Sequence, residues 1–272
     1  MTTRNLTDSN LIQWQSTDSA PALAPDGLHL WHIRTDADGD NVAACLDLLG
    51  ERQRNRAHGM HHAGYRERYI RAQFGLRRIL GLYLGIPPGA IDFAHGPAGK
   101  PMLERNPAGL AFNLTTTADL ALVAISAGAE VGIDCERLRP RRDLDAIARR
   151  MFSSEQARLL LETPAAERLA CFYRAWTALE ADAKADGRGL FRPRAPGASP
   201  PQVMHCIPAP GHIAAVARAA LPPAERWLTL EVEPFLSVGV NHHHDRPNPT
   251  SDQGDSRHAP YPAGTHDSAL LS

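Results

Sequence analysis

Two long helical segments, each set among short strand candidates, constrain the fold of this chain most strongly. One runs from about Tyr65 to Leu84 and is ended by a glycine and two prolines, and the other covers about residues 167–186 and is ended by Gly187 and Gly189. The stretches around them are short, apolar and broken by glycine and proline, and several alternate apolar and polar side chains with the period of a half-buried strand. We therefore expect an α+β fold with small, mostly antiparallel sheets rather than a doubly wound parallel sheet.

The shorter elements are predicted from the same patterns. Ser153 with Gln156 has the spacing of a capping box for a helix that ends near Leu161. Other short helices are expected at residues 45–49 and 143–151, and strands at residues 28–33, 91–93, 111–114, 120–126, 131–136, 202–207, 212–217 and 227–232.

Composition divides the chain into four segments. Residues 1–22 are polar and aperiodic, and residues 240–272 combine Pro, Gly, Ser, His and Asp with few apolar positions, so both are expected to be disordered tails. Between them we expect an N-terminal half, residues 23–127, and a C-terminal half, residues 128–239. The histidine tract at His242–Asp245 could bind a metal, but in a tail such a tract is more often incidental.

Net charge, cysteine spacing and the lack of long apolar runs limit the classes of protein to which this chain could belong. The 272 residues carry a formal net charge of −1, which predicts neither a nucleic-acid nor a membrane binder, so any anion site must be local. The four widely spaced cysteines form no C-x-x-C pair, and we expect reduced thiols. We find no apolar run of the roughly 20 residues that a membrane span needs and no signal sequence, and we expect a soluble, cytoplasmic protein.

An acidic strand is the first candidate for chemistry. In Val131–Glu136, strand alternation places Asp134 and Glu136 on one face and apolar side chains on the other. Two carboxylates held side by side repel each other unless a cation lies between them, and a hard divalent cation is a usual solution. The alternative is a strand whose acidic face is simply solvated.

A third carboxylate is predicted on the second long helix. Glu180 lies on the apolar stripe of that helix, one turn after Trp176, and Lys184 follows one turn later. Lys184 could neutralise Glu180 in an ordinary i,i+4 ion pair. In the functional reading, Glu180 is a metal ligand and general base, and Lys184 binds a phosphate.

Cationic candidates for an anion site lie in the N-terminal half. Most of its arginines are expected to be solvated, as on any basic helix. Gly99–Pro101 is a rigid turn that presents Lys100, and its alternative is a simple exposed hairpin turn. The chain has neither a Walker-type phosphate loop nor a G-x-G-x-x-G motif, which argues against nucleoside triphosphates and dinucleotides.

Taken in order, six short motifs resemble the signature series of the 4′-phosphopantetheinyl transferase superfamily, of the type that activates surfactin synthetase. They cover about residues 45–190. The motifs are Gly99–Pro101, Phe112–Leu114, Ala121–Ser126, Val131–Glu136, Met151–Glu155, and Trp176–Lys184 followed by Gly187–Leu190.

The resemblance implies a fold, a reaction and a partner. The fold would be a pseudo-twofold monomer of two similar α+β halves, with coenzyme A and Mg²⁺ in the cleft between them. The reaction would transfer 4′-phosphopantetheine from coenzyme A to a serine of an acyl or peptidyl carrier protein and release 3′,5′-ADP. The sequence does not distinguish Mg²⁺ from Mn²⁺, since both suit carboxylate oxygens.

The resemblance also implies roles for particular residues. Three carboxylates fall on the metal-ligand positions, and Glu180 is also the base that the family is proposed to use. Lys184 falls on a phosphate-contacting lysine that we count as catalytic. The implied metal ligands are Asp134, Glu136 and Glu180, and the implied coenzyme A contacts are Arg68, placed before the long helix, with Lys100, Pro101, Thr115, Thr116 and Lys184.

Two positions depart from the family pattern. Where the family usually has Ser-His-Ser, this chain has three threonines, and Thr116 cannot supply the imidazole. Leu179 stands where a lysine is usual. These departures favour the main alternative, a divergent protein that binds coenzyme A or a carrier protein with little or no transfer. A third possibility is a different reaction on a carrier-bound or coenzyme-A-linked substrate in the same cleft.

Overall fold

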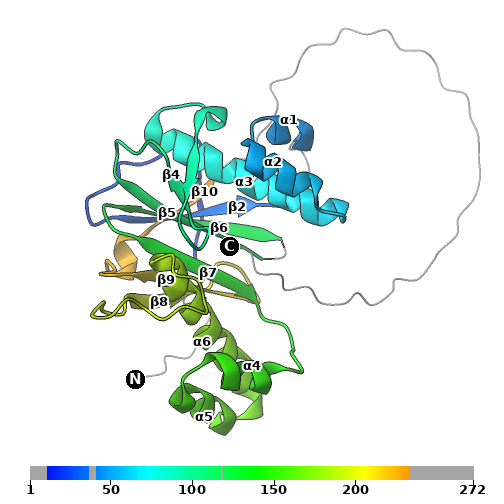
Figure 1. The fold of residues 1–272 in the computed structure, drawn as a ribbon, viewed down its shortest axis with the longest axis vertical. Helices are drawn as coiled ribbons and strands as arrows, with labels where there is room; N and C mark the ends of the chain where they lie inside the picture. Colours follow the sequence, from blue (N-terminus) through cyan, green and yellow to red (C-terminus); the bar gives the residue numbers. More distant parts are fainter. Residues whose placement is uncertain (1–10, 37–40, 118, 233–272) are drawn as a thin grey trace, which may run out of the picture.

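The computed structural model describes residues 11–36, 41–117 and 119–232, and its described part is α+β (Figure 1). Two sheets lie between two long helices. Next to them are a two-stranded hairpin and several short helices. None of the helices in these ranges is long and apolar enough to cross a membrane. The four cysteines are reduced thiols, as expected.

The larger sheet has five strands in the order β1-β10-β2-β6-β5. The strand β10 pairs in parallel with both of its neighbours, and the remaining pairs are antiparallel. The strands are β1 (Gln15–Thr17), β10 (Leu228–Val232), β2 (Leu28–Arg34), β6 (Leu120–Ala127) and β5 (Leu110–Thr117).

One face of this sheet is covered by the long helix α3 (Ala63–Leu84), which ends at Gly85 in the left-handed conformation that glycine favours. Leu76, Ile79 and Leu80 of α3 pack with Phe112 and other residues of the sheet. Fully burying a side chain of this size contributes about 1.5–3 kcal/mol. Before α3 come α1 (Val42–Asp47) and α2 (Glu51–His58), and after it come the short helix η2 (Pro88–Ala90) and the hairpin of β3 (Phe93–His95) and β4 (Pro101–Leu103).

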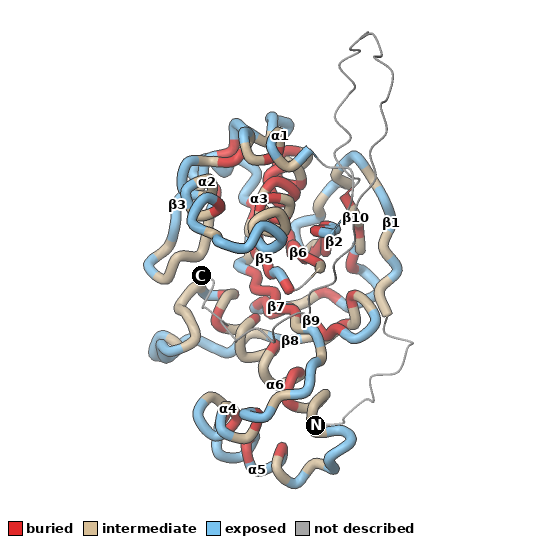
Figure 2. Tube along the Cα trace, turned by 90° about the vertical axis from the view of Figure 1, so that its right-hand side faces the viewer, coloured by how far each residue is buried: buried red, intermediate tan, exposed pale blue. Residues whose placement is uncertain are grey.

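The smaller sheet has the antiparallel order β7-β9-β8, from β7 (Val131–Arg137), β9 (His212–Arg218) and β8 (Gln202–Cys206). One of its faces packs on the larger sheet through Val131, Ile133 and Cys135, and the other faces the long helix α6 (Ala165–Ala185). Figure 2 shows that the buried part of the chain is concentrated in α3, β6, β7 and β9. The helices α4 (Leu144–Met151) and α5 (Ser154–Glu162) pack with the first half of α6, and η3 (Ala224–Arg226) precedes β10.

The predicted strands are confirmed with small shifts of boundary, except at residues 91–93, where β3 begins only at Phe93. Ile91 instead ends η2 and is buried in the core. The capping box of Ser153 and Gln156 is confirmed. The pseudo-twofold relation and a cleft between the halves stay predictions.

The predicted division of the chain needs two corrections. The tail assigned to residues 1–22 is wrong for residues 11–22, because β1 joins the larger sheet and the Trp14 indole donates to the carbonyl of Pro208 at 2.9 Å. The halves 23–127 and 128–239 are not separate sheets, because β10 from the second lies between β1 and β2 of the larger sheet. Residues 1–10 and the predicted tail at 240–272, with its histidine tract, lie outside the described residues.

Candidate active site

The predicted acidic face of β7 is confirmed. Asp134 and Glu136 point to the side opposite the apolar residues of the strand, which lie in the core between the two sheets. Asp134 is 4% exposed, so the alternative of a solvated acidic face is wrong for this residue. A carboxylate this buried needs compensating partners.

A close approach of helix and strand brings α6 to this face. At Gly132 an added Cβ would lie 2.0 Å from the carbonyl oxygen of Ala181, so only glycine fits at this position. Small residues on both sides of the contact, including Ala181 and Ala215, continue the close packing. Glu180 and Lys184 therefore lie over β7, one turn apart on the same side of α6.

Lys184 joins the two carboxylates. Its ammonium lies 2.6 Å from Oδ1 of Asp134 and 3.4 Å from Oε2 of Glu180, so the i,i+4 ion pair considered from the sequence is present and is extended by Asp134. Burial alone would lower the pKa of Lys184, but the two carboxylates outweigh that effect and raise the pKa above its ordinary value. Lys184 is thus a fixed positive charge at neutral pH.

The three carboxylates of the site carry more negative charge than the Lys184 ammonium neutralises. Burial, with the charges of Asp134 and then Glu180, raises the pKa of Glu136 to about 7. Burial and the charge of Asp134 also raise the pKa of Glu180, against the opposing effect of Lys184. The three predicted carboxylates are therefore close enough to perturb one another, and they are brought together by β7 and α6.

Trp176 is a member of the site that the sequence analysis did not assign. Its indole N–H donates a hydrogen bond to Glu136. Its ring also stacks on Phe172, with ring centroids 6.2 Å apart. The signal was its position one turn before Glu180, which places both side chains on the same stripe of the helix.

Thr115 and Thr116 lie on opposite faces of β5 and have different surroundings. The Thr115 hydroxyl is buried and donates to Oδ1 of Asp134 at 3.2 Å, whereas Thr116 is exposed. Strand alternation produces this separation. Leu179, where the family usually has lysine, packs against the apolar cluster of α4, α5 and α6.

A divalent cation fits the chemistry of these residues. Oδ2 of Asp134 is buried and accepts no hydrogen bond, and hard divalent cations prefer such carboxylate oxygens. In the described ranges, no group of three or more His, Cys, Asp or Glu side chains is already arranged to hold a metal ion. The Lys184 ammonium contacts two of the three predicted ligands, so these ligands would have to rearrange around a cation.

The predicted coenzyme A contacts of the N-terminal half are more dispersed. Arg68 lies inside α3, not before the long helix as expected, and its guanidinium lies over the ring of Tyr65, 5.8 Å from the centroid. Pro101 begins β4. Lys100 donates to Glu130 and to the carbonyl oxygens of Val131 and Ala185, so it is not the simply exposed turn lysine of the alternative reading.

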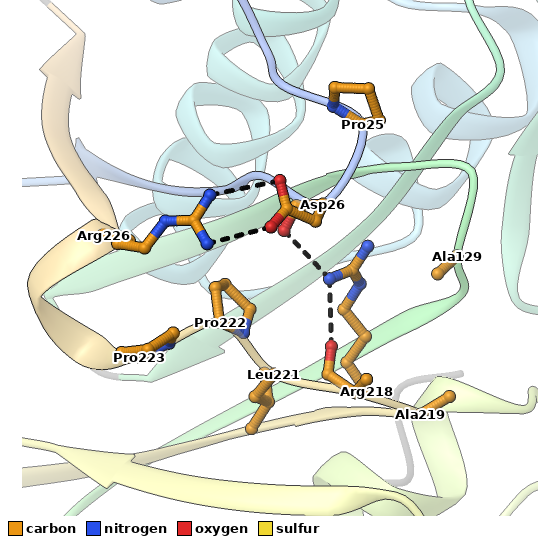
Figure 3. Close-up of a pocket in the computed structure, with 10 residues that line it drawn as sticks. Pro25, Asp26, Ala129, Arg218, Ala219, Leu221, Pro222, Pro223 and Arg226 are labelled. Carbon is orange, nitrogen blue, oxygen red and sulfur yellow. Dashed lines mark hydrogen bonds and ion pairs between the residues drawn. The ribbon is translucent and has the colours of Figure 1, made fainter.

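A surface pocket at the junction of the two sheets contains none of the predicted site residues (Figure 3). Arg218 donates there to the carbonyls of Asp26, Ala127 and Ala220, and Arg226 forms an ion pair with the Asp26 carboxylate. These groups belong to loops, to strand ends and, for Arg226, to η3. The hydrogen bonds of Arg218 therefore join the two sheets beside this pocket, and the pocket is not assigned to the chemistry.

Known protein families were compared with the whole chain, including the acidic site. A family model described as the 4′-phosphopantetheinyl transferase superfamily matches residues 130–229, the segment that contains all three carboxylates. The chain is 36% identical over 172 residues to the 4′-phosphopantetheinyl transferase HetI of Nostoc sp., a match that covers 62% of this chain and 73% of that protein.

Two further relatives carry the same description. The match to the 4′-phosphopantetheinyl transferase psf-1 of Bacillus pumilus is 36% identical over 115 residues, which is 42% of this chain and 48% of that protein. The match to 4′-phosphopantetheinyl transferase AcpT of Salmonella typhimurium is 37% identical over 102 residues, which is 37% of this chain and 52% of that protein. This chain belongs to the 4′-phosphopantetheinyl transferase superfamily.

Proposed function

We propose that the acidic cluster of β7 and α6 is the catalytic centre of a transferase that uses coenzyme A as donor and a carrier-protein serine as acceptor. As a member of its superfamily the chain is a 4′-phosphopantetheinyl transferase. The observation that carries the assignment of the centre is the partly buried group of Asp134, Glu136, Glu180 and Lys184 inside the segment that the family model matches.

In the proposed reaction the serine oxygen attacks the phosphorus that carries the pantetheine arm. A new P–O bond to serine forms, the P–O bond to the second phosphate breaks, and 3′,5′-ADP leaves. The proton of the serine hydroxyl passes to Glu180, directly or through a water.

Asp134, Glu136 and Glu180 would hold the metal ion. When bound, a divalent cation such as Mg²⁺ supplies positive charge that offsets the charge of the pyrophosphate as the bond breaks. Thr115 and Trp176 orient two of these ligands, since each donates a hydrogen bond to one carboxylate.

Lys184 is proposed to contact a coenzyme A phosphate, for which its ammonium would have to turn away from Asp134. In that position the phosphate would replace the two carboxylates as the counter-charge of the ammonium. Arg68 is the proposed partner of another phosphate, and Thr116, an exposed residue near the end of β5, is a further proposed contact of coenzyme A. The contacts of Pro101 and Thr115 with coenzyme A, a monomeric state and a cytoplasmic location stay predictions.

Intact-mass analysis of a panel of apo carrier proteins tests this function. Each acyl or peptidyl carrier protein is incubated with the protein, coenzyme A and Mg²⁺, with and without a chelator. We expect one carrier or more to gain the mass of a single phosphopantetheine arm, and the chelator to abolish the gain. No gain with any carrier, while coenzyme A binds measurably, would contradict the proposal and favour a divergent binding protein.

A further inference from the structure

The turn of the β3–β4 hairpin packs on the segment that follows α6. An added Cβ at Gly187 would lie 3.3 Å from the side chain of Lys100, and one at Gly189 would lie 3.5 Å from Cβ of Ala98. Both glycines have positive φ angles, of 67° and 77°, which favour glycine. Two separate sequence motifs, one in each predicted half, therefore meet at this contact.

The ammonium of Lys100 is fully used by acceptors of the C-terminal half. It donates to the carboxylate of Glu130, to the carbonyl oxygen of Val131 at 3.2 Å and to the carbonyl oxygen of Ala185 at 2.8 Å. A lysine ammonium has three N–H donors, so these three acceptors satisfy it. The side chain is only 9% exposed.

The two carbonyl acceptors lie on the elements that carry the catalytic carboxylates. Val131 is the first residue of β7, which bears Asp134, and Ala185 is the last residue of α6, which bears Glu180. The carbonyl end of a helix is its negative end and is stabilised by a positive charge. One ammonium therefore joins the start of β7 to the end of α6.

We infer that Lys100 is a positioning residue for the transfer reaction and does not bind a phosphate of coenzyme A. It fixes the end of α6 against β7, and so fixes Glu180 and Lys184 relative to Asp134. A phosphate contact would require Lys100 to give up acceptors that it already has. This inference rests on the proposed function, because it concerns the geometry of the proposed catalytic centre.

The test compares Lys100→Met and Lys100→Arg with wild-type protein on a carrier that the wild type modifies. Lys100→Met removes the charge and all three donors, and Lys100→Arg keeps a charge that could bind phosphate but replaces the compact ammonium with a planar fork. We expect kcat to fall at least tenfold in both variants. We expect KM for coenzyme A, and its Kd measured by calorimetry, to change less than threefold.

Glu130→Gln is the matched control, because it removes only the negative charge of the exposed partner of Lys100 and leaves both carbonyl contacts intact. Glu130 is 60% exposed, and ion pairs at such positions contribute little, so we expect kcat within twofold of wild type.

Three results would overturn the inference. A tenfold weaker Kd for coenzyme A in Lys100→Met that Lys100→Arg restores would make Lys100 a phosphate ligand. An unchanged kcat would leave Lys100 a purely structural residue, whether or not the melting temperature falls. If Lys100→Met does not fold, an unchanged kcat in Lys100→Arg decides against the inference. Absence of transfer by the wild type would instead refute the proposed function.

Discussion

Replacement of Gly132 by alanine should separate the two elements that form the active site. The new Cβ would lie 2.0 Å from the carbonyl oxygen of Ala181 and 2.5 Å from the backbone nitrogen of Ala185. Non-bonded heavy atoms normally approach to about 3.5 Å, so α6 must move away from β7 by roughly 1–1.5 Å. Both contacts are to backbone, and no rotation of a side chain can relieve them.

The displacement should cost both stability and activity. Overpacking of this kind destabilises a protein by about 1–3 kcal/mol. The 2.6 Å contact between Lys184 and Asp134 would lengthen beyond hydrogen-bonding distance. A misplacement of about 1 Å in a catalytic group can reduce the rate roughly 100-fold, and we expect a loss of that order in kcat.

Urea unfolding and single-turnover mass analysis of a modified carrier would measure these two effects. The matched control is Gly64→Ala in α3, where an added Cβ has nothing within 4 Å, and this change should be neutral or stabilising by up to about 1 kcal/mol. A Gly132→Ala protein with the stability and rate of wild type would refute the argument that this glycine sets the distance between α6 and β7.

Three further predictions each concern a single residue. Thr115→Val removes the hydroxyl that donates to Asp134 and should weaken Mn²⁺ binding, measured by calorimetry, about tenfold, while Thr115→Ser should keep the wild-type affinity. Equal Mn²⁺ affinities of Thr115→Val and wild type would contradict the orienting role of Thr115. Trp176→Phe keeps the aromatic packing but loses the donor to Glu136, so kcat should fall with little change in melting temperature, and a fall in melting temperature alone would assign Trp176 to packing. Burial lowers the pKa of His29 to about 4, so between pH 4 and about 6.5 the unfolded chain binds more protons than the folded protein. The free energy of unfolding should therefore rise by up to about 3 kcal/mol as the pH rises through this range, and that gain should be lost as the pH falls. A His29→Gln protein with the same slope of unfolding free energy against pH would contradict this.

The acidic site was largely predictable because it depends on local periodicity. Strand alternation placed Asp134 and Glu136 on one face, and helix periodicity placed Glu180 and Lys184 one turn apart. The C-terminal end of α6 followed from the glycines that come after it. These features need only the neighbouring residues along the chain.

The features that the sequence analysis missed depend on residues far apart along the chain. The parallel insertion of β10 between β1 and β2 pairs residues about two hundred positions apart, and the polar composition of residues 11–22 hides the strand that they form. The acceptors of Lys100 include two backbone carbonyls, which no residue pattern identifies. The division of roles between Thr115 and Thr116 also depends on which face of β5 meets β7.

The most direct test of the central claim compares wild type with Glu180→Gln on one apo carrier protein, with intact-mass detection and coenzyme A binding measured in parallel. A general base typically contributes about 10²–10⁴-fold, so the account predicts a rate loss of that order with the fold and coenzyme A binding retained. Near-normal transfer by Glu180→Gln would remove Glu180 from the mechanism and contradict the assignment of the acidic cluster as the catalytic centre.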